Sequence, residues 1–428
     1  MIHLKCRLIY HDGNKTNQFI ESPKNLIVDL QSRIEWIHSI PINDLLDFIE
    51  AFGNSIQENS TSTFASTSKH LSDFFRRDNL KRELDLSLRG NYLILDKFVK
   101  LENGGKKLYH TQPRGLAVHW IAGNVDELGI FSIIQALITK NVSLIKAPSN
   151  YENLLDLVNL LKLTNTEKLS GEELVKTISI IYLEKDDEQN QKLISENADV
   201  RIIWGGLDAV SSIISTPKKP FCEDIVFGPK YSYVILDEES ASKPDLVLKL
   251  AFDISIFDQN ACSSPHTIFV ETENKDILNS FGEKLSIAMD RVNKLIPKKS
   301  ISESKAMEIH EIRSENEFSG NVFSSKDTSW TVIISENDEL EKPCFSRVVF
   351  VKSILNANSL STFNNKKIQT IGIVMNKEKR LKLIDTLSLH GGDRSPTIGD
   401  MSTYENPWDG MFVMDRLVRW VALSKKRD

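Results

Sequence analysis

Cysteine is scarce in this sequence, with four residues among 428. Cys6, Cys222, Cys262 and Cys344 form no Cys-x-x-Cys pair, and none has a histidine at the spacing of a zinc site. Four scattered thiols are not the framework of a disulfide-rich protein either, so a reducing compartment is favoured. The sequence therefore predicts no metal site, and each cysteine needs its own explanation.

Other absences narrow the class of protein. Basic residues are not in excess, because 53 Lys and Arg stand against 59 Asp and Glu. Nucleic-acid-binding domains usually carry a basic surplus, so we expect no nucleic-acid partner. No run of 18 apolar residues occurs, and the first residues lack the charged and apolar segments of a signal peptide. We therefore expect no membrane span and a cytoplasmic protein.

The fingerprint Gly-x-Gly-x-x-Gly of ordinary dinucleotide-binding folds is absent as well. What is present, beyond residue 100, is an alternation of short apolar runs with helical patterns, from "RGLAVHWIAG" to "LDAVSSIIST". Fully apolar strands of this kind are typical of a parallel sheet with helices on both faces. We predict an α/β fold, whose ligands bind beyond the carboxyl ends of the strands.

Cys262 lies in the stretch "DQNACSSPHT", between polar residues and an apolar strand pattern. A lone cysteine is by default a small buried residue, and this stretch alone favours that interpretation about as much as a nucleophile. Small neighbours leave room around the sulfur, and a loop before a strand often exposes a reactive group. A thiolate is both a good nucleophile and a good leaving group, which suits acyl transfer.

Three further candidates follow strand patterns. Asn124 could donate a hydrogen bond to an oxyanion, although an asparagine there more often caps the next helix. Lys146 could hold a ribose hydroxyl or a phosphate, but a lysine is usually solvated. Gly205 and Gly206 precede a helical pattern, so their amides could approach a pyrophosphate, or they could form only a turn.

Taken in order, these stretches resemble the aldehyde dehydrogenase superfamily. The order is "AGN", "IKAPS", "WGG", "FGPKYSYVIL" and then the cysteine after "DQNA". The resemblance implies a variant Rossmann cofactor domain, which lacks the usual glycine fingerprint, and an α/β catalytic domain. It also implies that Cys262 is the nucleophile and that Asn124 lies in the oxyanion hole.

The same resemblance identifies residues for a cofactor, with Lys146 and Ser149 at the ribose and Gly205 and Gly206 at the pyrophosphate. The superfamily commonly has a glutamate where this chain has Ser149, or Asn150 in a register shifted by one residue. A carboxylate there binds ribose hydroxyls and repels a 2′-phosphate, so its replacement favours NADPH.

Val226, in the stretch "VFGPK", is a second departure from the superfamily. It occupies the position of the glutamate that activates water to hydrolyse the thioacyl enzyme. Because an apolar side chain is no general base, the resemblance implies acyl transfer and hydride reduction rather than release of a carboxylic acid. An enzyme that oxidises aldehydes, and a non-catalytic or acyl-transferring member of the fold, stay open as alternatives.

The cysteine stretch, "FGPKYSYVIL" and the late "PWDG…LVRW" are most similar to the bacterial acyl-CoA reductases, over residues 100–428. This family includes the reductase subunit of the luminescence fatty-acid reductase complex. The resemblance implies NADPH-dependent reduction of an activated, long-chain fatty acyl thioester to the aldehyde, through a thioacyl enzyme on Cys262. It further implies an acyl-CoA, an acyl carrier or an acyl-protein synthetase as donor, and a homo-oligomer.

We expect four regions along the chain. A mainly helical region, 1–100, packs on an NAD(P)-binding domain, 101–230, which is followed by a catalytic cysteine domain, 231–395. The last region, 396–428, is a return segment that ends in an amphipathic helix.

Two local features stay open in the sequence. His266 could pair with the cysteine four residues before it, but the same spacing suits a strand residue that turns away. The stretch "HGGDR", 390–394, could border the acyl or nicotinamide pocket, although a surface turn is the plainer interpretation. Trp408 is expected to pack rather than to catalyse.

Overall fold

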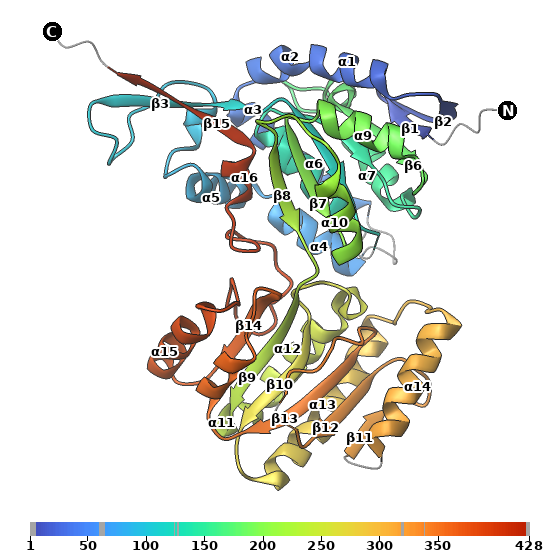
Figure 1. Cartoon of the computed structure of the whole chain (residues 1–428). Coiled ribbons are helices and arrows are strands. Elements are labelled where there is room, and N and C mark those ends of the chain that lie inside the picture. Colours follow the sequence, from blue (N-terminus) through green and yellow to red (C-terminus); the bar gives the residue numbers. More distant parts are fainter. Residues whose placement is uncertain are drawn as a thin grey trace. The chain divides into compact units, whose positions relative to one another are not determined.

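The structure is a computed structural model that describes residues 6–59, 65–123, 125, 128–317, 321–337 and 339–424. It divides into two compact units (Figure 1). Unit 1 comprises Met1–Gly228 and Met411–Asp428, and unit 2 comprises Pro229–Gly410. The chain therefore completes unit 2 before its last residues return to unit 1. No helix among the described residues has the length and apolar character needed to cross a membrane.

A seven-stranded sheet forms the centre of unit 1, in the order β2-β1-β6-β5-β4-β7-β8. Its strands are β1 (Cys6–His11), β2 (Asn14–Ile20), β4 (Leu116–Trp120), β5 (Val142–Lys146), β6 (Ile178–Leu183), β7 (Val200–Trp204) and β8 (Glu223–Phe227). The strands β4 to β8 pair in parallel, whereas β1 pairs antiparallel with β6 and β2. Both β4 and β7 are buried along their whole length, as their apolar sequences predict.

Helices between these strands cover the sheet (Figure 1). They are α6 (Leu128–Ile138), α7 (Glu152–Leu163), α8 (Gly171–Leu174), η2 (Val175–Thr177), α9 (Glu188–Asn197) and α10 (Leu207–Ser215). The N-terminal segment adds α1 (Lys24–Ser32), α2 (Ile34–Ser39), α3 (Ile42–Glu58), α4 (Ala65–Phe74), α5 (Arg77–Ser87) and η1 (Tyr92–Leu95). An apolar face of α3, which includes Leu45, Phe48 and Phe52, is buried, and α3 packs against α4 to α7.

The C-terminal segment differs from the sequence-based expectation. Helix α16 covers only Val413–Arg416, and the chain then forms β15 (Val418–Ser424). This strand pairs antiparallel with β3 (Lys107–Pro113), which lies beside it in Figure 1. The predicted terminal amphipathic helix is therefore wrong. Valines and a tryptophan favour a strand once a partner offers hydrogen bonds, and a single sequence does not reveal that β3 is this partner.

Unit 2 contains a six-stranded sheet in the order β11-β12-β13-β10-β9-β14. Its strands are β9 (Tyr231–Asp237), β10 (Pro265–Glu271), β11 (Asn321–Ser324), β12 (Thr331–Ser335), β13 (Val348–Ile354) and β14 (Ile368–Val374). All neighbours pair in parallel except β11, which is an antiparallel edge strand. Both units are thus α/β, and the predicted fold class is confirmed.

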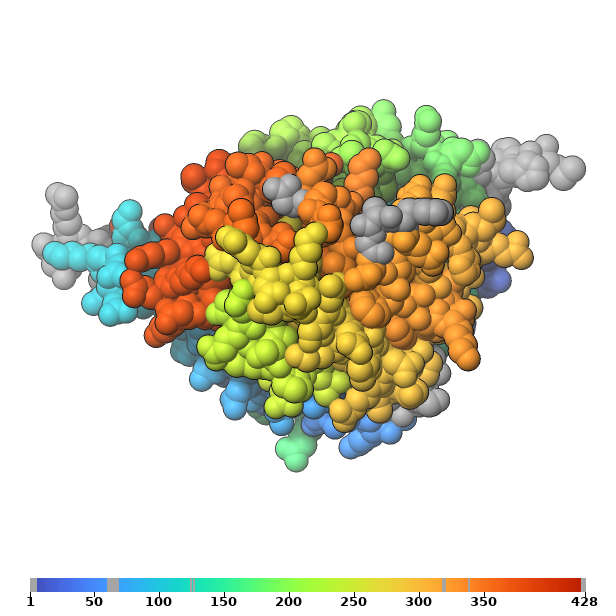
Figure 2. All heavy atoms as spheres, turned by 90° about the horizontal axis from the view of Figure 1, so that it is seen from below, coloured from blue at the N-terminus to red at the C-terminus, as the bar shows by residue number. Residues whose placement is uncertain are grey.

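The two largest apolar clusters of unit 2 pack against its sheet. One lies under α12 (Pro244–Ser255) and α13 (Lys275–Leu295), and the other under η4 (Ala357–Thr362) and α15 (Lys377–Ser388). The remaining helices are α11 (Glu238–Ala241), η3 (Ile256–Gln259) and α14 (Glu303–Glu317). The surface of unit 2 shown in Figure 2 is built from the segments coloured yellow-green to red.

Candidate active site

Cys262 lies in the turn between η3 and β10, in unit 2. All four cysteines lie in the described part of the chain, and Cys262 alone is half-buried, whereas the other three are buried. A nucleophile has to be reached by its substrate, so Cys262 is the cysteine residue whose partial exposure suits chemistry.

Two runs of left-handed backbone support the cysteine turn. Phe257, Asp258 and Gln259 have φ between 51° and 64°, and the residues 345–347 have φ between 57° and 63°. Left-handed conformations cost energy for residues other than glycine, and they persist only where the surroundings hold them. Here the Arg347 Nε and Nη2 atoms lie 2.8 and 2.6 Å from the Asp258 carboxylate. The two runs are therefore joined by a buried ion pair.

Side chains also fix the backbone on both sides of the sulfur. The Gln259 amide donates to the Pro265 carbonyl at 2.8 Å, and its oxygen accepts from the Val348 N–H at 2.9 Å. On the other side, the Ser232 hydroxyl donates to the Cys262 carbonyl at 2.7 Å and accepts from the Thr370 N–H. The turn is thus tied to β9, β10, β13 and β14, which gives Cys262 a rigid base.

Three side chains determine the electrostatics at the sulfur. Burial raises the pKa of the Cys262 thiol to about 12, and the Asp409 carboxylate raises it as well. The Arg394 guanidinium and a hydrogen bond from the Gln369 side chain act in the opposite direction and lower that pKa. The thiol is therefore protonated at neutral pH, and any reaction needs the thiolate to be stabilised.

Asp409 belongs to a buried network. Its side chain is 3% exposed and accepts a 2.6 Å hydrogen bond from Gln369 Nε2. The Lys230 ammonium lies 3.9 Å from Asp409 and 2.5 Å from Asp393. Burial raises the pKa of Asp409, and Lys230 lowers it. The carboxylate next to the nucleophile is thus held by one amide and one cation.

Arg394, from the "HGGDR" stretch, is 8% exposed. It donates to the carbonyls of Met401 and Thr403 at 3.2 and 2.8 Å, and its guanidinium carbon lies 4.4 Å from the Trp408 ring centroid. A surface turn is therefore wrong for this residue, while Trp408 packs as predicted. The stretches "HGGDR" and "PWDG" are visible in the sequence, but only the fold brings Arg394 and Asp409 near the cysteine.

His266 points into the interior of unit 2. It is 2% exposed, and its ring packs edge-on against Phe345 with the centroids 5.2 Å apart. Neither ring nitrogen makes a hydrogen bond within the described residues, and burial lowers its pKa to about 3. A neutral ring without a hydrogen bond to sulfur gives no support to a cysteine–histidine pair.

The predicted cofactor residues lie in unit 1, at the carboxyl edge of its sheet. Lys146 is the last residue of β5, and its Nζ atom lies 5.9 Å from the Tyr182 ring centroid. Burial lowers the pKa of Lys146, and Lys185 lowers it further. Ser149 and Asn150 follow in an exposed turn, where the Asn150 amide donates to the Gly123 carbonyl.

Gly205 and Gly206 connect β7 to α10, and Gly206 is the N-terminal cap of that helix. A side chain added at Gly206 would meet no atom within 4 Å. The strand order changes direction at β4, with β5 on one side and β7 on the other, which is where open α/β sheets bind ligands. Open space, helix amides and a lysine fit an anionic dinucleotide, and neither Ser149 nor Asn150 adds a carboxylate.

Asn124 and Val226 are the two other predicted positions. Asn124 lies outside the described residues, so its predicted role stays a prediction. Val226 is half-buried on β8, where it pairs with Ile203 of β7. Within the residues the structure describes, no three His, Cys, Asp or Glu side chains gather as a metal site.

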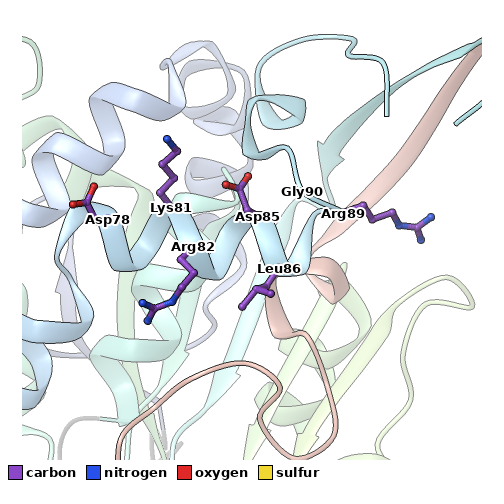
Figure 3. Close-up of a pocket in the computed structure, with 7 residues that line it drawn as sticks. All are labelled: Asp78, Lys81, Arg82, Asp85, Leu86, Arg89 and Gly90. Atoms are coloured by element: carbon purple, nitrogen blue, oxygen red, sulfur yellow. The ribbon is translucent and has the colours of Figure 1, made fainter. Parts of the chain in front are cut away.

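A surface groove along α5 is shown in Figure 3. Its charged side chains project from α5 in different directions instead of toward one centre. Several of them already contact other residues of unit 1. The Asp85 carboxylate accepts from the Tyr92 N–H at 2.8 Å, and the Arg89 guanidinium lies over the Trp420 ring. The residues that line it are Asp78, Lys81, Arg82, Asp85, Leu86, Arg89 and Gly90. None is a predicted site residue.

Solved structures of similar fold are aldehyde dehydrogenases. Lactaldehyde dehydrogenase aligns with a TM-score of 0.66 at 13% identity, over 97% of this chain and 98% of its own. Aldehyde dehydrogenase 21 from Physcomitrella patens gives 0.71 at 13% identity, over 97% of each chain. The NADP-dependent glyceraldehyde-3-phosphate dehydrogenase from Bacillus halodurans, solved with NADP, gives 0.66 at 14% identity, over 98% and 96%. The chain therefore has the aldehyde dehydrogenase fold.

Sequence comparison then gives the family. The model of the acyl-CoA reductase (LuxC) family matches residues 37–420, so the chain belongs to that family. The long-chain acyl-protein thioester reductase of Aliivibrio fischeri is 28% identical over 342 residues, which are 78% of this chain and 68% of the relative. The protein of that name from Photorhabdus luminescens is 29% identical over 360 residues, covering 81% and 69%. The predicted resemblance is confirmed.

Proposed function

We propose that the protein reduces a long-chain fatty acyl thioester to the aldehyde, through a thioacyl intermediate on Cys262 and with NADPH as reductant. The observation that carries the proposal is the half-buried residue Cys262 on a rigid turn, in a member of the acyl-CoA reductase family. Because several relatives are named acyl-protein thioester reductases, an acyl group carried by a protein is the proposed donor, with acyl-CoA as its soluble analogue.

The first half of the reaction needs only the cysteine and the donor. The Cys262 sulfur loses its proton and attacks the acyl carbon, so that a new carbon–sulfur bond forms. The bond to the donor sulfur then breaks, and the donor leaves as a thiol after it takes up a proton. Asn124 is the proposed donor to the oxyanion of this step, and one well-aimed donor contributes about 3–4 kcal/mol.

The second half reduces the acyl group. NADPH, when bound, supplies a hydride to the acyl carbon. The residues proposed to hold it are Lys146 and Ser149 at the adenosine ribose and its 2′-phosphate, and Gly205 and Gly206 at the pyrophosphate. The carbon–sulfur bond then breaks, its electron pair returns to Cys262, and the aldehyde leaves.

Val226 accounts for the proposed product. An isopropyl side chain cannot take a proton from water, so hydrolysis of the thioacyl enzyme lacks a base at this position. The acyl group on Cys262 therefore persists until hydride arrives. An aldehyde, rather than a carboxylic acid, is the expected product.

Mass spectrometry of the intact protein tests the proposal. Incubation with a long-chain acyl-CoA should add one acyl group to the wild type and to a Cys222→Ala control, and none to Cys262→Ala. Cys222 is the matched control because it is a buried thiol of unit 1. Aldehyde should form only after NADPH is added. Acylation and turnover by Cys262→Ala, or a carboxylic acid as the main product, would contradict the proposal.

A further inference from the structure

Arg7 of β1 lies at the carboxyl edge of the sheet in unit 1, near the predicted cofactor residues. The strand β1 runs antiparallel to β6, and Arg7 is paired there with Tyr182, the last residue but one of β6. The strand β6 pairs in parallel with β5, which ends at Lys146. Arg7 is therefore two strands away from Lys146, at the same edge of the sheet.

Two tyrosine rings hold the Arg7 guanidinium. Its central carbon lies 5.2 Å from the centroid of the Tyr182 ring and 5.6 Å from that of the Tyr151 ring. Tyr151 is the N-terminal cap of α7 and follows Ser149 by two positions. The Lys146 Nζ atom lies 5.9 Å from the same Tyr182 centroid. Arg7 and Lys146 are thus two cations around one ring, and Arg7 also lies over the ring that follows the Ser149 turn.

The donors of the Arg7 side chain are available to a ligand. Among the described residues, no side-chain hydrogen bond or ion pair joins its guanidinium to an acceptor. The aromatic rings provide no oxygen acceptor, and a guanidinium carries five N–H groups in a rigid fork. Arg7 is half-buried, so solvent reaches these groups. An arginine fixed by two rings in this way is preorganised for an anion with several oxygens.

The second cation, Lys146, is also without a carboxylate at ion-pair distance in the described part of the chain. Burial and the neighbouring Lys185 lower the pKa of Lys146, and Glu184 raises it. The opposing charge of Glu184 does not outweigh the other two effects. An anion bound at this edge would offset the charges of both Arg7 and Lys146.

We propose that Arg7 binds the 2′-phosphate of NADPH together with Lys146, and that it distinguishes NADPH from NADH. A phosphate offers three terminal oxygens and more than one negative charge, which suits the paired N–H groups of a guanidinium. NADH carries a hydroxyl at this position, so it gains no ion pair from Arg7. The inference rests on the function proposed above, in which the adenosine ribose lies at Lys146 and Ser149.

Isothermal titration calorimetry with two nucleotides tests the inference on the full-length protein. Adenosine 2′,5′-bisphosphate and 5′-AMP differ only in the 2′-phosphate, and neither needs an acyl donor. Arg7→Met should weaken the bisphosphate about tenfold and 5′-AMP by less than about twofold, because only the bisphosphate loses an ion pair. Arg7→Lys keeps the charge and loses the fork, so it should weaken the bisphosphate about threefold. The affinities of NADPH and NADH should change in the same pattern.

Arg33→Met is the matched control. Arg33 is another partly buried arginine of unit 1, with its Nη1 atom 4.0 Å from Glu173, and its loss should alter neither affinity. Cys6, the buried neighbour of Arg7, shows whether β1 stays paired. It should not react with a thiol reagent in native buffer, as peptide mass spectrometry can verify. If Arg7→Met exposes Cys6, Arg7→Gln takes its place with the same expected affinities.

The outcomes separate this inference from the function on which it rests. If the wild type binds both nucleotides and the folded Arg7 variant binds the bisphosphate equally well, Arg7 does not contact the 2′-phosphate, and only this inference fails. An equal loss of both nucleotides also overturns it, because Arg7 would then support the adenosine site without distinguishing the phosphate. If the wild type binds neither nucleotide, the proposed cofactor site fails, and this inference fails with it.

Discussion

The two units place their candidate residues at opposite ends of their strands. In unit 1, Lys146 and Gly205 follow the carboxyl ends of β5 and β7. In unit 2, Cys262 and Gln369 lie at the amino ends of β10 and β14. Helix N-termini meet the carboxyl edge of a parallel sheet and offer N–H groups to anions, as α10 does. The amino edge of a parallel sheet lacks these N–H groups, because helix C-termini meet it.

This difference explains why the cysteine turn is rich in buried charged side chains. Cys262 follows the carboxyl end of α12 and η3, where backbone carbonyls do not stabilise a thiolate. The largest influence that lowers the pKa of Cys262 is therefore a side chain, the Arg394 guanidinium, and the Arg347 side chain supports the backbone of the turn. The turns of unit 1 instead leave open space, as at Gly206. Gly205 and Gly206 of unit 1 would therefore bind mainly through backbone amides, whereas charged side chains gather around Cys262.

Of the changes considered, the replacement of Arg347 in unit 2 should have the largest effect. Arg347→Met leaves the Asp258 carboxylate buried without its partner, which should cost about 3–5 kcal/mol of the free energy of unfolding. Cys344, buried in unit 2, should then react with a thiol reagent at lower urea concentration, and Cys222 in unit 1 should not. Cys262 alkylation in native buffer should change too, because its turn loses its support.

The matched variant is Arg201→Met in unit 1. Arg201 is fully buried and contacts both oxygens of Asp224, at 2.7 and 2.8 Å. In this variant, Cys222 should react with the thiol reagent at a lower urea concentration than in the wild type. The reactions of Cys344 and Cys262 should be the same as in the wild type. If both variants alter Cys262 equally, the arginine acts through general stability and not through the cysteine turn.

The stability of unit 2 should also depend on pH, through the buried carboxyl group of Asp253. Asp253 of α12 accepts hydrogen bonds from the Gly399 and Met401 N–H groups, and burial raises its pKa to about 7. The folded state then binds the proton more tightly than the unfolded state. Unit 2 should therefore lose about 3 kcal/mol of stability as the pH rises from about 4 to 7.

Unit 1 should respond to pH in the opposite sense at Asp224. Burial raises the pKa of Asp224, but hydrogen bonds from Arg201 and Lys218 outweigh burial and lower it. Its contribution to stability is lost as the pH falls. Urea-induced labelling of Cys344 and Cys222 measures the two units separately, and Asp253→Asn should flatten only the Cys344 profile. A Cys344 profile unchanged in that variant would exclude Asp253 as the source.

The sequence predicted the parts of this molecule that depend on local pattern. Buried strands such as β4 and β7, and the cysteine before β10, could be found because apolar runs and small polar turns are local signals. The sequence could not predict which side chains surround Cys262, namely Gln369, Asp409 and the buried Arg394. These residues lie more than 100 positions from Cys262, and only the fold of unit 2 brings them near it. The strand β15 was missed for the same reason, as its partner β3 lies about 300 residues earlier.

The smallest expected effect concerns the open turn of unit 1. Ser149→Glu would place a carboxylate in the exposed turn after β5, where we propose that the 2′-phosphate of NADPH binds. Like-charge repulsion should weaken NADPH about tenfold, which corresponds to about 1.4 kcal/mol, and should leave NADH unchanged or tighter. Quenching of tryptophan fluorescence measures both affinities.

Ser149→Gln, of the same size and without charge, should alter neither by more than a small factor. If Ser149→Glu loses affinity for NADPH and NADH equally, the turn lies near the cofactor but does not contact its 2′-phosphate. If neither affinity changes, the 2′-phosphate binds elsewhere. Because the turn is exposed, this variant should not unfold unit 1, so the affinities report recognition alone.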